Sequence, residues 1–459
     1  MDLLRIPTVF LVFIESLLSI PIMYALNKMT LMKDQRWIFA VSVFALALIG
    51  VISFVLVKSS PAKKESLFYV WSVFAFTSCV DLFIGLELDQ YVSGFMEFYF
   101  REGEPYLQTA HGTLINWWDG TGHYALYLIL IALCCAGQSY REVGLYWVGS
   151  IFNSMIVLMV GSMIGPTGLK WSYMLNIPYV FFPIYAAIRF LRDGSKSRGT
   201  TRQSQSGQPT WEKLAEVFFG LWFAAATVLA FFRGIAILGC KGVIFQTYLT
   251  DFEPYIKDDN EYGKMQVLTY LFYFIPFYLG AVCSLIYPGQ KWVRDWSLIH
   301  AGAAVQSQLS FIGGSLHWRT PEKFQVPNTS EAHFFFWLVN LSLLVVPHLH
   351  ALYCHRNEVA DLFLRGTTTT SSPSKSTPSR SEGHVATSLF KSTPSRGDNP
   401  VTTSLFKSTP SRVDGPVATS LFKSTPSRGD NPVTTSPSRS TSSRRDGPVT
   451  RQMRKVKAS

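Results

Sequence analysis

About ten apolar runs, each close to 20 residues long, dominate the chain as far as residue 355. They lie at roughly 7–26, 37–57, 67–88, 121–137, 144–165, 173–191, 214–239, 267–287, 297–315 and 333–353. A helix needs about 20 such residues to cross a bilayer, and in lipid only helices and closed barrels satisfy their own backbone hydrogen bonds. The sequence therefore predicts an all-α polytopic membrane protein with about ten transmembrane helices.

The positive charge of the chain is concentrated in its C-terminal tail. Residues 366–459 hold 15 Lys and Arg against 5 Asp and Glu, which is +10 of the formal +11. The apolar body is nearly neutral, so the basic pI does not indicate a nucleic-acid-binding surface on a folded domain. Six cysteines show no zinc-like spacing, and no metal or other cofactor is expected.

The same tail is repetitive. The segment Ser388–Arg396 recurs from Ser404 and from Ser420, and such a polar composition predicts disorder. The chain ends with Lys455 and Lys457 at the fifth and third positions from the last residue. This pattern resembles the dilysine signal through which coatomer returns membrane proteins to the endoplasmic reticulum.

Basic residues in short loops indicate the orientation of the spans. The bias of Lys and Arg predicts that both termini are cytosolic. Asn328 then lies on the lumenal side in an Asn-Thr-Ser sequence, where it is a candidate N-glycosylation site.

Two parts of the chain share a pattern. Phe83, Gly85, Glu104, Pro105 and Tyr106 are matched, at one offset of 149 residues, by Phe232, Gly234, Glu253, Pro254 and Tyr255. Five identical residue pairs at a single offset indicate an internal duplication of the chain. We expect two N-terminal helices in residues 1–58, one bundle in 62–192, a cytosolic linker in 193–212, and a second bundle in 213–355.

Polar residues inside the apolar runs are the candidate site residues, because such groups are costly in lipid and commonly face a cavity. Asp81 is expected to point inward, whereas Glu87 and Asp119 could line a cavity or lie at helix ends. Arg233 could extend to the headgroups or pair with a buried acid or phosphate. The predicted ligand-binding residues, none of them catalytic or metal-binding, are Asp81, Trp118, Asp119, His123, Asn153, Arg233 and Gln306.

Several motifs resemble those of the transmembrane 6 superfamily. They are Phe95–Tyr99, Glu102–Leu107, Thr109–Gly112, Trp118–Thr121, Gly144–Trp147, Phe232–Gly234, Tyr270–Tyr273 and Gln306–Gln308. The resemblance covers roughly residues 1–355. It implies two EXPERA domains, each a bundle of about four helices around a cavity for a sterol or lipid, related to emopamil-binding protein and the sigma-2 receptor.

The resemblance also implies a function. It predicts a protein of the endoplasmic reticulum and the ER–Golgi intermediate compartment that promotes lipidation and secretion of triglyceride-rich lipoproteins and controls cellular triglyceride and lipid droplets. Its partners would be membrane lipid or sterol and the proteins of lipoprotein assembly and lipid synthesis. The alternative is a sterol isomerase or another lipid-modifying enzyme. Asp81 and Gly85 stand where the isomerase has its His and Glu, which argues against isomerisation.

Overall fold

The computed structural model describes residues 7–57, 60–197, 210–287 and 289–368, and every regular element in these ranges is a helix. The α-helices are α1 (Thr8–Leu17), α2 (Ser19–Asn27), α3 (Gln35–Leu56), α4 (Ser66–Leu88), α5 (Ala110–Trp118), α6 (Tyr124–Cys135), α7 (Arg141–Ile164), α8 (Ile177–Ser197), α9 (Thr210–Ile237), α10 (Val243–Asp251), α11 (Tyr262–Thr269), α12 (Ile275–Ile286), α13 (Trp292–Leu316) and α14 (Ser330–Thr368). The short 3₁₀ and π segments are η1 (Thr30–Lys33), η3 (Pro61–Lys64), η4 (Tyr99–Gly103), η5 (Pro105–Gln108), η6 (Asp119–His123), η7 (Trp171–Asn176), η8 (Pro254–Lys257), η9 (Tyr270–Phe274) and η10 (Glu322–Phe324). The all-α class predicted from the sequence is confirmed. The tail with Lys455 and Lys457, and most of the expected linker, lie outside the described residues.

Eight stretches of the described chain are long and apolar enough to cross a bilayer. They are Thr8–Asn27, Gln35–Leu56, Ser66–Leu88, Arg141–Ile164, Trp171–Asp193, Thr210–Ile237, Tyr262–Ile286 and Ser330–Arg356. The expected spans at 121–137 and 297–315 are helical but are not among the eight. The helix α13, which covers the second of them, is 25 residues long and carries the buried polar residues His300, Gln306 and Gln308.

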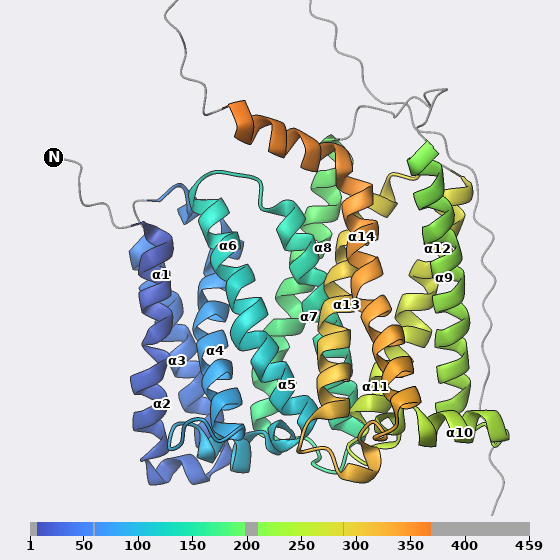
Figure 1. Cartoon of the computed structure of the whole chain (residues 1–459). Coiled ribbons are helices and arrows are strands. Elements are labelled where there is room, and N and C mark those ends of the chain that lie inside the picture. Colours follow the sequence, from blue (N-terminus) through green and yellow to red (C-terminus); the bar gives the residue numbers. More distant parts are fainter. Residues whose placement is uncertain (1–6, 58–59, 198–209, 288, 369–459) are drawn as a thin grey trace, which may run out of the picture. The chain divides into compact units, whose positions relative to one another are not determined.

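The order of elements repeats along the chain. The first series is α4, η5, α5 with η6 and α6, α7, then α8; the second is α9, η8, α11 with η9 and α12, α13, then α14. In each series the second helix is interrupted by one π segment, η6 or η9. The described elements belong to one compact unit, whose helices stand side by side (Figure 1). The structure thus contains two helical bundles with one topology, as a duplication would produce; the domain boundaries themselves remain predictions.

The two bundles meet along α7 and α13. A Cβ atom added to Gly149 of α7 would lie 1.8 Å from the carbonyl oxygen of Ile299, and one added to Gly302 of α13 would lie 1.9 Å from that of Tyr146. Only glycine fits at such distances, and small residues allow helices in membranes to approach backbone to backbone. These two glycines therefore bring the bundles into direct contact.

The helices α1, α2 and α3 precede the repeat and pack on the first bundle, chiefly against α4. Glu15 of α1 is buried and accepts hydrogen bonds from the Ser53 hydroxyl of α3 at 3.0 and 3.1 Å. These bonds join α1 to α3 where the two helices pack together.

The segment around Asp119 differs from the expected one. The sequence predicts a span that begins near residue 121, whereas in the structure a helix begins at Ala110 and continues through η6 into α6. A π turn inserts one residue into a helix and often lies at a functional site. Asp119 is therefore the first residue of a π segment inside a helix.

Candidate functional site

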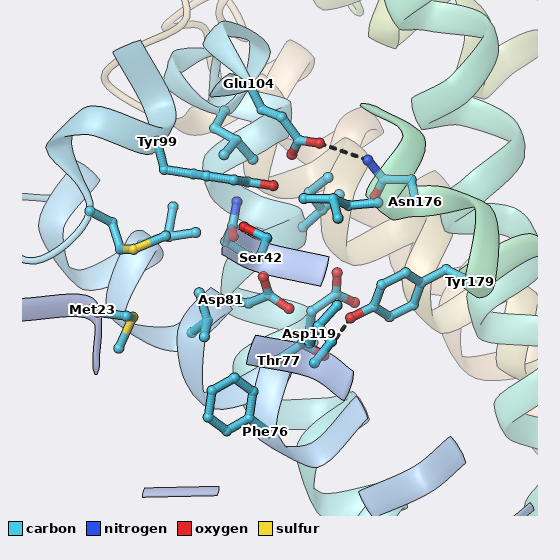
Figure 2. Close-up of a pocket in the computed structure, with 18 of the residues that line it drawn as sticks. Met23, Ser42, Phe76, Thr77, Asp81, Tyr99, Glu104, Asp119, Asn176 and Tyr179 are labelled. Carbon is cyan, nitrogen blue, oxygen red and sulfur yellow. Dashed lines mark hydrogen bonds between the residues drawn. The ribbon is translucent and has the colours of Figure 1, made fainter. Parts of the chain in front are cut away.

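A cavity of about 150 Å³ lies in the first bundle, between α4, α5, α7 and α8 on one side and α2 and α3 on the other (Figure 2). Its walls are mostly apolar, and the N-terminal helices contribute Ile22, Met23, Leu26, Ala45 and Leu46. An apolar cavity with a few convergent polar groups is the usual form of a small-molecule site. This volume accommodates part of a hydrocarbon chain or a ring.

Helical spacing explains which residues line it. On α4 the lining residues include Thr77, Asp81 and Ile84, and on α7 Ile151, Met155 and Leu158. Residues three or four apart share one face of a helix. The cavity is therefore built from one stripe on each of these two helices.

Asp81 and Asp119 form one polar region of the wall. Figure 2 shows their carboxyl groups pointing into the same part of the cavity, with Ser42 and Tyr179 nearby. Tyr179 donates a hydrogen bond to the hydroxyl of Thr77 and stacks on Phe74 with ring centroids 4.2 Å apart, which fixes the phenol at this edge of the cavity. The inward position expected for Asp81 is what the structure contains.

A chain of hydrogen bonds connects Asp119 to His123, Ser150 and Trp118. Its Oδ1 atom lies 2.5 Å from Nδ1 of His123, and Nε2 of His123 lies 2.8 Å from Oγ of Ser150. The indole of Trp118 donates to the same Ser150 oxygen at 3.0 Å. Neither Trp118 nor His123 is among the residues that line the cavity, although His123 contacts Asp119, which does; direct ligand contact by either remains a prediction.

Glu104 faces the cavity beside η4. Its carboxyl accepts a hydrogen bond from the Asn176 amide at 2.8 Å (Figure 2) and another from the Tyr106 hydroxyl at 3.2 Å. Burial raises the pKa of Glu104 to about 7. Burial, together with the nearby charges of Glu104 and Asp81, also raises the pKa of Tyr99 above its ordinary value.

Glu87 has a structural role. Its carboxylate accepts hydrogen bonds from the backbone N–H groups of Gly94, Phe95 and Met96 at 2.5, 3.1 and 2.5 Å. It holds the loop that brings Met96 and Tyr99 to the cavity. Glu87 lies at the end of α4, where it also borders an open hollow with Gln90 and Tyr91, and it is not among the residues that line the cavity between the helices.

Gly85 is covered by an aromatic ring. A Cβ atom there would lie 3.5 Å from the indole of Trp117, whose Nε1 donates to Asp89 at 2.8 Å. The place where the resemblance puts the second acid of the isomerase thus packs against Trp117, and Gly85 is not among the lining residues.

The second bundle has an ion pair in the corresponding place. At the offset of 149 residues, Ile84 corresponds to Arg233 and Glu104 to Glu253. Arg233 is 2 % exposed and forms a salt bridge with Glu253. Nε of Arg233 also donates to the Tyr248 hydroxyl at 3.0 Å. Of the two alternatives for Arg233, the structure contains the buried pair, in the position where we expected a second cavity.

Asn153 and Gln306 join the two bundles. Nδ2 of Asn153 donates to Oε1 of Gln306 at 2.6 Å, and both residues are buried. Gln308 is also buried and donates to the Tyr270 hydroxyl. Neither Asn153 nor Gln306 lines the cavity described above, so a ligand role for either remains a prediction. Asn328 is exposed, two residues before α14 begins.

The sequence reasoning did not place Glu104, Tyr99 or Asn176 at the site. Glu104 belongs to the duplicated Glu-Pro-Tyr motif, and Asn176 lies near the start of a span. A repeated acid could have been read as a buried one, since Glu253 is buried in the same way. No sequence signal links Asn176 to an acid 72 residues earlier.

Comparisons with known proteins agree with this architecture. Residues 18–201 match the family model described as transmembrane 6 superfamily member 2-like, transmembrane domain, and residues 242–354 match the EXPERA (expanded EBP superfamily) model. The chain is 38% identical over 347 residues to transmembrane 6 superfamily member 2 of Homo sapiens, covering 74% of this chain and 90% of that protein. The protein of the same name from Mus musculus is 36% identical over 344 residues, with the same coverage. No solved structure matches the chain.

Helical bundles of repeated topology, a cavity in the first of them and an EXPERA match over the second define a polytopic membrane protein of the EXPERA class. The chain belongs to the transmembrane 6 superfamily, and the relatives that it resembles over most of their length are member 2.

Proposed function

We propose that this chain regulates lipid metabolism in the early secretory membrane by binding a sterol or another lipid in the cavity of its first bundle. Through that site it promotes lipidation and secretion of triglyceride-rich lipoproteins and controls cellular triglyceride and lipid droplets. The observation that supports lipid binding is an apolar cavity, inside a membrane-spanning bundle, with acidic groups gathered at its wall. Family membership supports the place of action, in the endoplasmic reticulum and the ER–Golgi intermediate compartment, with both termini cytosolic.

Mass spectrometry of lipids that copurify with the protein in mild detergent tests the binding step. The Asp81→Ala/Asp119→Ala variant removes both acids at one part of the wall, and Asp251→Asn, at an exposed acid of α10, is the matched control. A lipid enriched with wild type and with the control, but lost from the double variant, is the expected result. If all three carry the same bulk lipid, the chain does not act by binding lipid in this cavity.

The cellular step needs its own test. Cells that secrete lipoproteins are depleted of the chain and then supplied with wild type, the double variant or the control variant. Secreted triglyceride should return with wild type and Asp251→Asn only, with cellular triglyceride changing in the opposite direction. Equal rescue by the double variant would show that the cellular function does not depend on the two acids of the cavity.

An isomerase or another lipid-modifying enzyme is the second candidate. The close contact between Asp119 and His123 supports it, because a carboxylate and an imidazole are common groups in proton transfer. Rescue of isomerase-deficient cells by wild type, and its loss with His123→Phe, would support this candidate. Absence of rescue by wild type that is present in the membrane would exclude sterol isomerisation.

A further inference from the structure

One short motif recurs in residues 369–459, beyond the described part of the structure: a Ser or Thr, then Pro, any residue, and Lys or Arg. Proline-directed protein kinases recognise such sequences, and some of them require the base. Every Ser-Pro and Thr-Pro dipeptide of this segment belongs to the motif. The residues that a kinase would modify are Ser372, Thr377, Thr393, Thr409, Thr425 and Ser436.

The motif lies in the part of the repeat that varies least. Four copies of the 16-residue repeat follow one another over residues 372–435, and Lys-Ser-Thr-Pro-Ser-Arg is the longest stretch that all four share. The first copy lacks the Leu-Phe pair of the other three but keeps Lys375–Arg380. The second and third copies differ directly after this stretch, where Gly397 corresponds to Val413. Copies that diverge around an unchanged stretch indicate that this stretch has a function of its own.

The described part of the chain contains the motif twice, at Ser60–Lys63 and at Thr320–Lys323, and the fold occupies both hydroxyl groups. Ser60 is the N-cap residue of η3, where its Oγ accepts a hydrogen bond from the N–H of Ala62 at 3.2 Å. Thr320 is 1 % exposed and donates to the carbonyl oxygen of Gly314 at 2.6 Å. A kinase binds its substrate as an extended, accessible segment, so these two copies are not available. The six copies beyond residue 369 lie in a composition that predicts disorder, which favours modification.

The helix α14 connects the membrane to these six sites. Its apolar stretch Ser330–Arg356 is long enough to cross a bilayer, and the helix continues to Thr368. Arg356 forms a salt bridge with Glu212, near the start of α9, which holds this end of α14 against its neighbour. The basic tail therefore begins close to the membrane surface, on the side predicted to be cytosolic, where kinases and ATP are present.

Phosphorylation changes the charge of the tail enough to matter. Residues 366–459 carry +10 of formal charge, and basic segments next to a span are attracted to the anionic lipids of the cytosolic leaflet. One phosphate contributes about −1.5 to −2 at pH 7. Six phosphates contribute about −9 to −12, which cancels the charge of the tail.

We propose that the six residues are phosphorylated by proline-directed kinases, and that the phosphates release the basic tail from the anionic surface of the membrane. In each transfer the Ser or Thr oxygen forms a bond to the γ-phosphorus of ATP, while the bond from that phosphorus to the ADP oxygen breaks. The hydroxyl proton passes to the catalytic base of the kinase. This inference does not depend on lipid binding in the cavity.

Mass spectrometry of the full chain tests the modification. One preparation is isolated from cells with phosphatase inhibitors present, and another, in nanodiscs, is treated with a cyclin-dependent kinase and ATP with Mg²⁺. We expect phosphate on the six motif residues of the tail and none on Ser60 or Thr320. If the six residues carry no phosphate in either preparation, the inference is wrong.

Vesicle binding tests the release. The full chain is dephosphorylated, reconstituted in nanodiscs of phosphatidylcholine, and centrifuged with heavier vesicles of phosphatidylcholine alone or mixed with phosphatidylserine. We expect the nanodiscs to sediment only with the vesicles that contain phosphatidylserine. Treatment with the kinase and ATP should lower the partition coefficient at least about tenfold, because the phosphates cancel the positive charge.

Two sets of substitutions separate the phosphates from other effects. Replacing the six motif residues of the tail by Ala changes no charge, so vesicle binding should be unchanged before kinase treatment and should persist after it. The matched control removes the same number of hydroxyl groups from the same repeats, none of them before Pro, and should behave as wild type. Its substitutions are Thr387→Ala, Ser388→Ala, Thr403→Ala, Ser404→Ala, Thr419→Ala and Ser420→Ala.

Two results of the vesicle experiment would contradict the inference. If the phosphorylated chain still sediments with phosphatidylserine vesicles to the same extent, the phosphates do not release the tail. If the unmodified chain sediments equally with phosphatidylcholine vesicles, the tail does not bind through its charge. Neither result affects the lipid binding proposed for the cavity, which has its own test.

Discussion

Arg233 shows what a buried charge needs in this chain. Its guanidinium lies among the Glu253 carboxylate, the Tyr248 hydroxyl and the Asn340 amide oxygen, so its charge and several of its N–H groups are satisfied. Removing one member of such a pair leaves the other buried without its counter-ion, which costs about 3–5 kcal/mol. Arg233→Met should therefore lower the free energy of unfolding by about that amount.

Thermal unfolding in detergent measures this effect. The double variant Arg233→Met/Glu253→Gln should recover most of the lost stability, and Arg101→Met, at an exposed arginine, should leave it unchanged. If the double variant is less stable than Arg233→Met, Glu253 stabilises the folded chain even without Arg233, which would contradict this explanation.

Glu104 makes the stability of the folded chain depend on pH. Its pKa in the folded chain, about 7, exceeds the ordinary value of 4.5, so the folded state holds this proton more tightly than the unfolded state. The stability that Glu104 contributes is complete below pH 4.5 and is lost as the pH rises through about 7, by about 3 kcal/mol in total.

Glu104→Gln should remove this loss, because a neutral amide resembles the protonated acid. The apparent melting temperature should therefore fall less between pH 5 and pH 8 in Glu104→Gln than in wild type. Glu102→Gln, at an exposed acid, is the matched control. An unchanged difference between the two pH values would show that Glu104 is ionised in the folded chain throughout.

At the scale of elements, the contact of α7 with α13 depends on two glycines. Adding a side chain at Gly149 or Gly302 would place Cβ within 2 Å of a backbone oxygen of the other helix, which cannot move aside as a side chain can. Gly302→Val should separate the helices and yield little folded protein. Gly220→Ala should be tolerated, because its Cβ would meet its nearest side-chain atom at 3.7 Å. Detergent gel filtration of the two variants checks this prediction, and a monodisperse Gly302→Val would contradict it.

The sequence predicted most elements because hydrocarbon-length apolar runs leave a chain little choice but helices. The duplicated motif pointed to the repeated order of elements, and the isolated acid at Asp81 pointed to the cavity. The helix through Asp119 was not predicted, because Trp118-Asp119-Gly120 resembles a turn and a π segment has no simple periodicity. The partners of Asn153 and Arg233 come from distant helices, and a single sequence does not contain that pairing.

At the scale of the whole molecule, the bundles are joined at three levels. Arg141 of α7 bonds both carboxylate oxygens of Asp295 in α13, at 3.1 and 2.8 Å, and the two glycines hold the middle. Asp89, after α4, contacts His317 and accepts from the Trp318 indole, each at 3.1 Å. A protein in which one repeat moves against the other needs an interface with two arrangements, so these contacts argue for a single rigid unit.

Cleavage between the bundles tests this rigidity. A protease site inserted within residues 198–209 should be cut without separating the halves, which should elute together from gel filtration in mild detergent. The same cleaved chain with Asp89→Ala and Arg141→Ala should separate more readily. Separation of the cleaved wild type would show that covalent connection holds the bundles together.

The ion pair between Arg233 and Glu253 has a consequence for stoichiometry. The first bundle keeps a cavity next to Ile84, whereas its duplicate has an internal salt bridge in the corresponding place. A saturating titration should thus count one lipid per polypeptide although the sequence contains two copies of the bundle. The second bundle would then be a structural scaffold, and its sequence could change without altering the lipid that the first bundle binds.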